Sequence, residues 1–263
     1  MYVGRLWHLR DAPAHSHEII VPSGTIELVF NLHEDELRIY RPGVRERFRR
    51  FSGAVVSGAY ATAFATDTRQ HASIMGVHFR TGGAFPFLRV EAHELASTHV
   101  DLENLWGTGG RTLRDRLGEA ATPEARFRLL EYALVQRLRG ASEPHPAVRA
   151  ALAVLARPEG SGPVRDIVRD LGVSHRRFIR LFSREVGMPP KLFRRVQRFQ
   201  RALELARQTP APNWAQLAVE CGCFDQSHLI REFLDFASLT PTDCHRRRNS
   251  RVMPNHMPLC GDG

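Results

Sequence analysis

Hydrophobic and polar positions alternate in the first eighty residues of the chain. Between Thr25 and Leu32, apolar side chains recur at every second position, Ile26, Leu28 and Phe30, which is the period of a half-buried strand. Further strands are predicted at residues 37–40, 54–57 and 73–79, separated by turns that contain glycine or proline. Several short strands with such breaks predict a small β-barrel or sandwich.

The period becomes helical after Gly83. Thr122-Pro123-Glu124 has the hydroxyl cap, the proline and the acidic residue that favour a helix start. Apolar residues then follow at helical spacing as far as Leu138, and Gly140 is predicted to end the helix. We expect a sheet-rich domain with trailing helices at 1–140 and a linker at 141–147.

Residues 148–248 are predicted to form an all-α domain that contains two helix-turn-helix units. In the first unit, an amphipathic helix from Val164 ends at Gly172, and Ser174 caps a second helix with Phe178 and Phe182 on its buried side. In the second unit, a helix that begins near Trp214 ends at the turn residue Gly222. The fold class is therefore α+β with two domains.

A second capped helix and a long spacer complete this domain. Asp225 is predicted to cap the second helix of the second unit, with Leu229 and Phe233 buried. A helix over residues 191–207 joins the two units, and we expect it to place them about 34 Å apart, one turn of DNA. Residues 249–263 have no period and are predicted to be a flexible tail.

The second helix of each unit carries the candidate DNA-binding residues. In a helix-turn-helix, the N-terminal half of this helix enters the major groove. Arginine pairs with guanine, glutamine with adenine, and an aliphatic side chain contacts the thymine methyl group. For His228 we expect either packing or a phosphate contact. The predicted DNA-binding residues are His175, Arg176, Arg177, Ile179, Arg180, Gln226, Ser227, His228, Ile230 and Arg231.

The charge distribution supports a polyanionic partner. The chain has a formal net charge of +9. Residues 148–250 contain 18 basic and 10 acidic residues, whereas residues 1–147 contain 18 and 17. A positive excess confined to one region is typical of a surface that binds nucleic acid, although an arginine-rich surface without a partner is the simpler alternative.

The remaining composition excludes several classes of protein. No apolar run is long enough to span a membrane, and the N-terminus lacks the apolar core of a secretory signal, so we expect a cytoplasmic protein. All four cysteines, Cys221, Cys223, Cys244 and Cys260, lie in the last fifth of the chain. We interpret them as buried reduced thiols rather than as disulfides or zinc ligands.

Residues 221–233 contain the run CG-x-F-D-Q-S-H-x-x-R-x-F, and Thr240-Pro241 follows it. Mainly through this run, residues 148–248 closely resemble the AraC/XylS family of transcription regulators. Two positions depart from the family: Cys223 replaces an aromatic residue, and Ser238 replaces the glycine of the final turn, which we expect to be slightly less stable. The resemblance implies an N-terminal domain, often a cupin-like barrel, that binds a small effector or dimerises.

A metal site in the N-terminal domain is the main alternative to a sensory role. Cupin enzymes bind metal through His-x-His, a nearby glutamate and a distant histidine, and His15, His17 and His78 offer a partial match. Glu18 and Glu27 have the wrong spacing for the remaining ligand. We predict no metal, cofactor or catalytic site, and the chain is not expected to be an enzyme.

The sequence thus predicts a DNA-binding transcription regulator that is controlled by a small effector. The expected partners are double-stranded DNA, the effector, RNA polymerase and a second copy of the chain. Two other classes stay open: a cupin-type metalloenzyme with a DNA-binding appendage, and a repair protein with an alkyl-accepting cysteine. Because no cysteine precedes Cys221, the sequence argues against the zinc-thiolate domain of such a repair protein.

Overall fold

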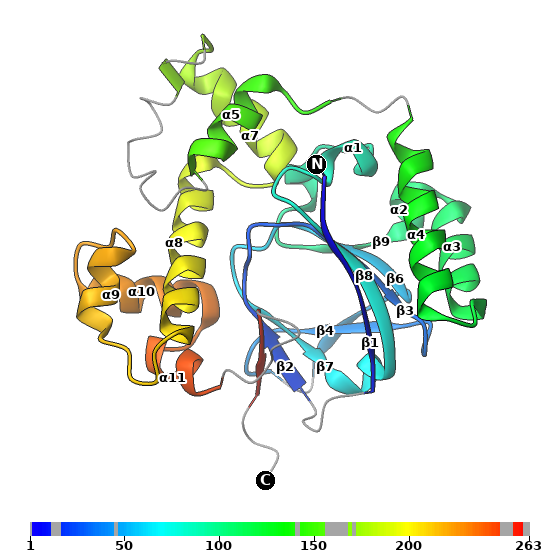
Figure 1. The fold of residues 1–263 in the computed structure, drawn as a ribbon, viewed down its shortest axis with the longest axis horizontal. Helices are drawn as coiled ribbons and strands as arrows, with labels where there is room; N and C mark the ends of the chain where they lie inside the picture. Colours follow the sequence, from blue (N-terminus) through cyan, green and yellow to red (C-terminus); the bar gives the residue numbers. More distant parts are fainter. Residues whose placement is uncertain are drawn as a thin grey trace.

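The computed structural model describes residues 2–11, 17–44, 47–139, 143–155, 168–169, 172–247 and 255–259. A sheet-rich domain (residues 2–139) is followed by a helical domain (residues 143–247), as Figure 1 shows. The predicted two-domain α+β fold is confirmed. No helix within the described ranges is long and apolar enough to cross a membrane.

The described strands form two five-stranded antiparallel sheets. The first sheet has the order β1-β8-β3-β6-β9 and the second has the order β10-β2-β7-β4-β5. The first sheet contains β1 (Val3–Arg10), β3 (Glu27–Asn31), β6 (Ala54–Ser57), β8 (Ser73–Phe79) and β9 (His99–Asp101). The second contains β2 (His17–Ile20), β4 (Leu37–Tyr40), β5 (Phe48–Phe51), β7 (Phe64–Asp67) and β10 (His256–Pro258).

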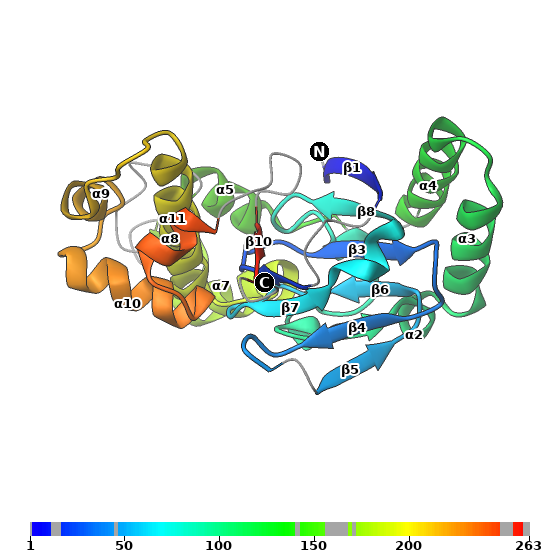
Figure 2. The same cartoon turned by 90° about the horizontal axis from the view of Figure 1, so that it is seen from below.

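The strands form a sandwich rather than the closed cupin-like barrel that the family resemblance implies. Their hydrogen-bonded pairs among the described residues give two separate sheets that face each other (Figure 2). An alternating apolar pattern cannot distinguish the two arrangements, because each strand buries one face in a barrel and in a sandwich alike. The strand positions predicted at residues 37–40, 54–57 and 73–79 are confirmed.

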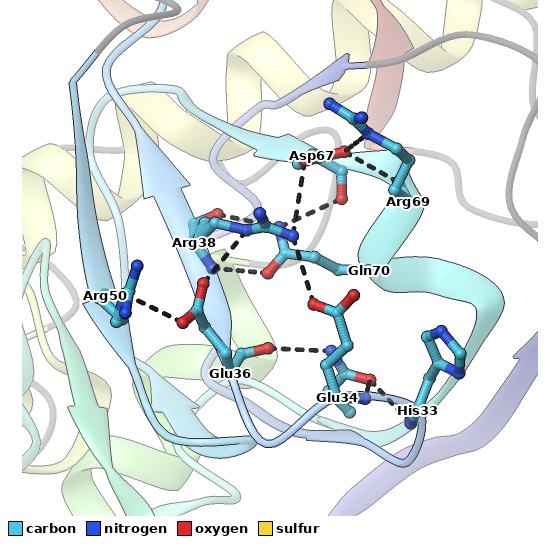
Figure 3. A network of polar contacts seen from close by, with 9 residues as sticks. His33, Glu34, Glu36, Arg38, Arg50, Asp67, Arg69 and Gln70 are labelled. Atoms are coloured by element: carbon cyan, nitrogen blue, oxygen red, sulfur yellow. Dashed lines mark hydrogen bonds and ion pairs between the residues drawn. The ribbon is translucent and has the colours of Figure 1, made fainter.

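A polar network fixes the register at one end of the second sheet (Figure 3). The Arg38 guanidinium lies 3.3 Å from Glu34, 3.4 Å from Glu36 and 3.7 Å from the buried Asp67. The backbone N–H of Arg38 donates to the side-chain oxygen of Gln70, and the Gln70 amide donates to the Arg38 carbonyl. These contacts join β4 to the end of β7 and to the short helix that follows it.

Short and long helices pack around the two sheets. In the sheet-rich domain they are η1 (Thr68–Ala72), α1 (Phe85–Leu88), η2 (Ala92–Leu95), α2 (Leu102–Trp106), α3 (Thr108–Glu119) and α4 (Pro123–Leu138). The predicted start of α4 is confirmed, because the Thr122 hydroxyl accepts a hydrogen bond from the backbone of Ala125 at 3.2 Å. The expected trailing helices are therefore present.

The helical domain consists of six described helices. These are α5 (Pro146–Leu155), α7 (His175–Val186), α8 (Pro190–Arg207), α9 (Trp214–Glu220), α10 (Gln226–Ala237) and α11 (Pro241–Arg246). Helix α5 starts inside the segment that is predicted to be a linker at 141–147, since proline favours the first turn of a helix. The helix predicted from Val164 lies outside the described residues, apart from Val168 and Arg169.

The two domains pack directly against each other. The side-chain amides of Gln197 and Gln200 on α8 donate to the carbonyls of Ser23 and Pro22, at 3.3 and 2.6 Å. The backbone N–H of Ala63 donates to the carbonyl of Phe236 on α10 at 2.8 Å. Helix α7 packs on η2 of the sheet-rich domain. Side chains of both domains accordingly belong to one buried cluster.

The C-terminal segment differs from the predicted flexible tail. Residues 256–258 form β10, the edge strand of the second sheet, next to β2 in both views (Figures 1 and 2). The segment lacks a hydrophobic period, but Met257 is fully buried. A three-residue strand is too short to produce a period, so the sequence pattern could not reveal it.

Candidate functional site

Helix α7 presents the first group of predicted DNA-binding residues. The Ser174 hydroxyl accepts a hydrogen bond from the backbone of Arg177, and Gly187 ends the helix in the left-handed conformation with φ of 92°. Phe178, Leu181 and Phe182 are buried, as predicted. The N-terminal half of the other face is exposed and carries His175, Arg176, Arg177, Ile179 and Arg180.

The turn before α7 has the expected geometry. Gly172 has φ of +64°, a conformation that a side chain would strain, and no atom lies within 4 Å of the place where a Cβ would be. Val168, from the helix predicted before this turn, is buried. The turn and the second helix of the first unit therefore agree with the prediction.

Helix α10 presents the second group. The Asp225 carboxylate accepts a hydrogen bond from the backbone of His228 at 2.7 Å, which confirms the predicted cap. Leu229 and Phe233 are buried. Gln226, Ser227 and Arg231 are exposed, and Ile230 is half-buried. Gly222 makes the turn after α9 with φ of +71°.

The His228 side chain contacts the turn before α10 rather than extending away from it. Its Nδ1 accepts a hydrogen bond from the backbone N–H of Phe224 at 3.2 Å, and its Nε2 lies 3.4 Å from the Glu232 carboxylate. These contacts favour the packing role over the phosphate role that the sequence left open. The imidazole holds the turn against the first part of α10.

The buried face of α10 carries a carboxylate that is not predicted from the sequence. Glu232 is 3% exposed, and its Oε1 lies 2.9 Å from Arg195 Nε and 3.6 Å from Arg198 Nη2, both on α8. Arg195 also bonds Asp235 on the surface of α10. The position of Glu232, three residues after the buried Leu229, was the available signal that it faces inwards.

Phe224 is a second residue that the sequence reasoning did not select. It immediately precedes Asp225 at the start of α10 and is 89% exposed. Val219, near the end of α9, is 70% exposed. Both belong to the unit that carries Gln226.

The sheet-rich domain encloses a cavity between its two sheets. It has a volume of about 90 Å³, and its lining is mainly apolar, with Trp7, Val29, Val55 and Ile74 from the first sheet and Ile39 from the second. For comparison, a dry apolar cavity of about 150 Å³ accommodates benzene. At about 90 Å³ this cavity is smaller, so it fits only a very small, mainly apolar molecule or the apolar end of a larger one.

An uncharged polar pair lies on one side of this cavity. The Tyr60 hydroxyl and His99 Nδ1 are 2.5 Å apart, and the rings of Phe51 and Phe64 pack on His99. Burial lowers the pKa of His99 to about 3 and raises the pKa of Tyr60 to about 12. At neutral pH the pair is uncharged and offers hydrogen bonds to a ligand.

His99 should make stability depend on pH. Its folded pKa of about 3 lies below the ordinary unfolded value of about 6.5, so the unfolded chain takes up the proton first as the pH falls. Stability contributed by neutral His99 is present above about pH 6.5 and is lost below it. Between about pH 6 and pH 4, wild type should lose about 1.4 kcal/mol more per pH unit than His99→Gln in urea unfolding.

The exposed His93 provides the control for this measurement. His93→Gln should keep the wild-type dependence, because its side chain is about half exposed and bonds the surface residue Glu91. If the His99→Gln curve ran parallel to wild type over this pH range, a buried neutral His99 would be wrong.

A Glu27–His78 pair and a basic cleft lie at the open end of the cavity. Glu27 and His78 are 2.6 Å apart; burial alone would raise the pKa of Glu27, but the hydrogen bond and charge of His78 outweigh it and lower that pKa. Here the cavity meets a cleft of about 920 Å³ between the domains. The two spaces share Arg5, Ser23, Thr25 and Asn255, and α8 contributes Arg194, Arg198, Arg201 and Arg207 to the cleft.

The partial metal motif does not assemble among the described residues. His78 pairs with Glu27, while the His17 ring packs edge-on against Tyr40. His15 lies outside the described residues. In the parts of the chain that the structure describes, no three His, Cys, Asp or Glu side chains form a group that could hold a metal ion.

The cysteine interpretation holds for three of the four thiols. Cys221, Cys223 and Cys244 are buried and not in disulfides, while Cys260 lies outside the described residues. Burial raises the pKa of Cys221 to about 11 and that of Cys244 to about 12. Because the thiolate is the reactive form, these cysteines are suited to packing rather than to alkyl transfer.

Comparisons with known proteins match each domain separately. Residues 167–247 match a family described as "Helix-turn-helix domain", and residues 1–101 match one described as "Domain of unknown function (DUF6597)". A curated protein of Haemophilus influenzae, an "Uncharacterized HTH-type transcriptional regulator", is 28% identical over 93 residues. This match covers 35% of the chain and 31% of the relative, so the chain spans about a third of the relative's length.

Solved structures of ToxT from Vibrio cholerae are similar over nearly the whole chain. One has a TM-score of 0.50 at 8% identity and covers 92% of this chain and 97% of ToxT. Another, described as bound to an unsaturated fatty acid, has a TM-score of 0.49 at 7% identity and covers 93% and 94%. At this level of identity the likeness of the first structure concerns the fold alone.

Proposed function

Because residues 167–247 form a helix-turn-helix domain of the AraC type, we propose that the chain is a transcription regulator that reads two successive major grooves of DNA. The observation that carries the proposal is the pair of capped helices, α7 and α10, each with a buried apolar face and an exposed face of residues suited to reading bases. Helix α8, 18 residues long, holds the two units on one rigid spacer of about 27 Å.

Selection of DNA by the purified full chain tests this proposal. Random-sequence DNA should yield a bipartite site, and footprinting should show two protected segments one helical turn apart. Affinity should fall steeply with salt, since each phosphate contact releases counterions. Diffuse protection with no selected sequence would contradict sequence-specific reading.

Arg176 and Arg231 are the residues most suited to reading guanine, one on each unit. Either Arg→Ala substitution should weaken binding to the selected site by about 1–3 kcal/mol and relax preference at one base pair, because a bidentate contact is lost. Quantitative binding to a panel of single-base variants of the site measures this. Arg116→Ala, an exposed arginine on α3, is the control and should leave binding unchanged.

An outcome of a different kind would reassign these residues. If Arg176→Ala or Arg231→Ala weakened binding to all sequences equally, the side chain would contact phosphate instead of a base.

The exposed Phe224 adds an apolar contact at the start of α10, and a thymine methyl group is the partner that fits it.

We infer that the cavity of the sheet-rich domain binds the effector. Its lining supports a compact, mainly apolar molecule with one group that hydrogen-bonds to the Tyr60–His99 pair. A binding role is favoured over the metalloenzyme alternative, since the polar groups named around the cavity pair with one another. Regulation would follow if the effector binds one arrangement of the domains better than another.

Two further partners belong to this proposal. Tyr132 and Val135 are more than half exposed on α4, and this apolar surface supports a homodimer through the sheet-rich domain. Analytical ultracentrifugation of wild type and Tyr132→Glu would test it.

A regulator bound beside a promoter acts on RNA polymerase, and transcription in vitro from the selected site distinguishes activation from repression.

A further inference from the structure

The last described segment of the chain returns from the helical domain to the sheet-rich domain. Strand β10 begins ten residues after Arg246, the last residue of α11, and pairs antiparallel with β2. The backbone N–H of Val21 donates to the carbonyl of Asn255, and that of Leu259 donates to the carbonyl of His17, both at 3.0 Å. Figure 1 shows β10 beside β2, between the sheets and α11.

The sequence of β10 fits this edge position. Pro258 has no N–H to donate, but it lies opposite Glu18 between two hydrogen-bonded positions, and β10 is the outer strand among those described in its sheet. The side of Pro258 that lacks the N–H therefore faces away from β2. Proline here also prevents a further strand from adding to the edge.

The two faces of β10 contact different parts of the molecule. Met257 is fully buried and lies opposite Ile19, in the cluster that also contains Phe199 and Phe236 of the helical domain. Adjacent His256 points to the other face. There it lines the cavity together with Asn255 and Ile20.

The buried carboxylate of Glu18 on β2 contacts the His256 side chain. The Nδ1 of His256 lies 2.7 Å from Glu18 Oε2, on the diagonal neighbour position of β2. Glu18 is 5% exposed, and His71 lies 4.0 Å from the same oxygen. A charge-assisted contact of this kind holds the strand in one register.

We propose that β10 is a wall of the effector site and couples that site to the second helix-turn-helix unit. This inference rests on the proposed function. An apolar ligand whose polar group reaches the Asn255–His256 side contacts a segment joined through the backbone to α11. Displacing this segment also withdraws Met257 from the core that the two domains share. Occupancy of the cavity therefore changes how tightly the sheet-rich domain packs against the helical domain.

Access to the cavity tests the first part of the proposal without a known ligand. Val29 lines the cavity, so a Val29→Cys, Cys260→Ser protein carries a reactive thiol inside it. The native buried cysteines have raised pKa values and should react slowly. With N-ethylmaleimide as the probe, adding His256→Ala or Met257→Glu should accelerate labelling of the introduced thiol by about tenfold, because local opening controls access.

A matched histidine substitution and a reversible lock control this experiment. His93→Ala removes an exposed imidazole in the same domain and should leave the labelling rate unchanged. Ile20→Cys with His256→Cys places the two thiols across a non-hydrogen-bonded pair, where a disulfide fits. When these two changes are added and the disulfide is formed before labelling, the rate should equal that of the starting protein. Equal rates in all variants would overturn the assignment of β10 as a wall.

Binding to the selected DNA tests the coupling. The oxidised and reduced forms of the Ile20→Cys, His256→Cys protein, which share one sequence and one fold, should differ at least about fivefold in Kd, as a typical coupling energy gives. Equal affinities would overturn the coupling. If no DNA sequence is selected at all, the proposed function fails instead, and the labelling rates still decide whether β10 closes the cavity.

Discussion

Replacing Phe233 by alanine is expected to lower the free energy of unfolding by about 3–5 kcal/mol. The side chain is fully buried where α8, α9 and α10 meet. Its ring centroid lies 4.9 Å from that of Phe199 and 6.4 Å from that of Trp214, both in edge-on contact. Alanine would leave a cavity that three helices cannot close without losing other contacts. Urea unfolding followed by circular dichroism measures the change.

Phe224→Ala is the matched control for this substitution. It removes the same type of side chain just before the start of α10, but from a position that is 89% exposed. Stability should change by less than about 0.5 kcal/mol. Phe182, fully buried in the first unit, should behave like Phe233. An unchanged midpoint for Phe233→Ala would remove this residue from the core.

The sequence predicted the helical domain well because its signals are local. Ser174 and Asp225 each accept a hydrogen bond from a backbone N–H three residues further on, as Thr122 does in the sheet-rich domain, so a short stretch of sequence contains the whole cap. The same applies to Ser238, which ends α10 with φ of 56° where the family has glycine. A serine in this conformation is strained, as expected for that turn.

The arrangement of the strands depended on contacts that a local pattern does not contain. Strand β3 lies between β6 and β8, which follow it by more than twenty residues, and β10 joins β2 from the far end of the chain. Alternation shows which side chains point inwards but not which strand pairs with which. The pattern therefore left a barrel and a sandwich open, and only the family resemblance implied the closed barrel where the described strands form two separate sheets.

In the candidate site, too, the residues placed by local pattern could be predicted and those brought together by distant contacts could not. Exposed positions on α7 and α10 follow from helical periodicity, because the buried face fixes the opposite one. The cavity is different, because Trp7, Tyr60, His99 and His256 come from four separated segments and meet only after the sheets have packed. Phe193 is similar: it is buried and packs near Gly24 of the other domain, a contact between residues far apart in the sequence.

Glu232 should be the most sensitive polar residue of the second unit. Glu232→Ala is expected to cost about 2–3 kcal/mol of stability, because it removes the buried carboxylate that bonds the partly buried Arg195 and Arg198. Burial lowers the pKa of Arg195, but its hydrogen bonds to Glu232 and Asp235 outweigh that effect and raise it. Urea unfolding again provides the measurement.

Asp235→Ala separates the buried contact from the exposed one. Asp235 bonds the same Arg195, but its side chain is 60% exposed, so its loss should cost less than about 1 kcal/mol. Glu232 also lies next to His228, which supports the turn before α10. Glu232→Ala should therefore weaken DNA binding even at temperatures where the domain stays folded, whereas Asp235→Ala should not. Equal effects of the two substitutions on stability would show that burial of Glu232 does not determine the strength of this network.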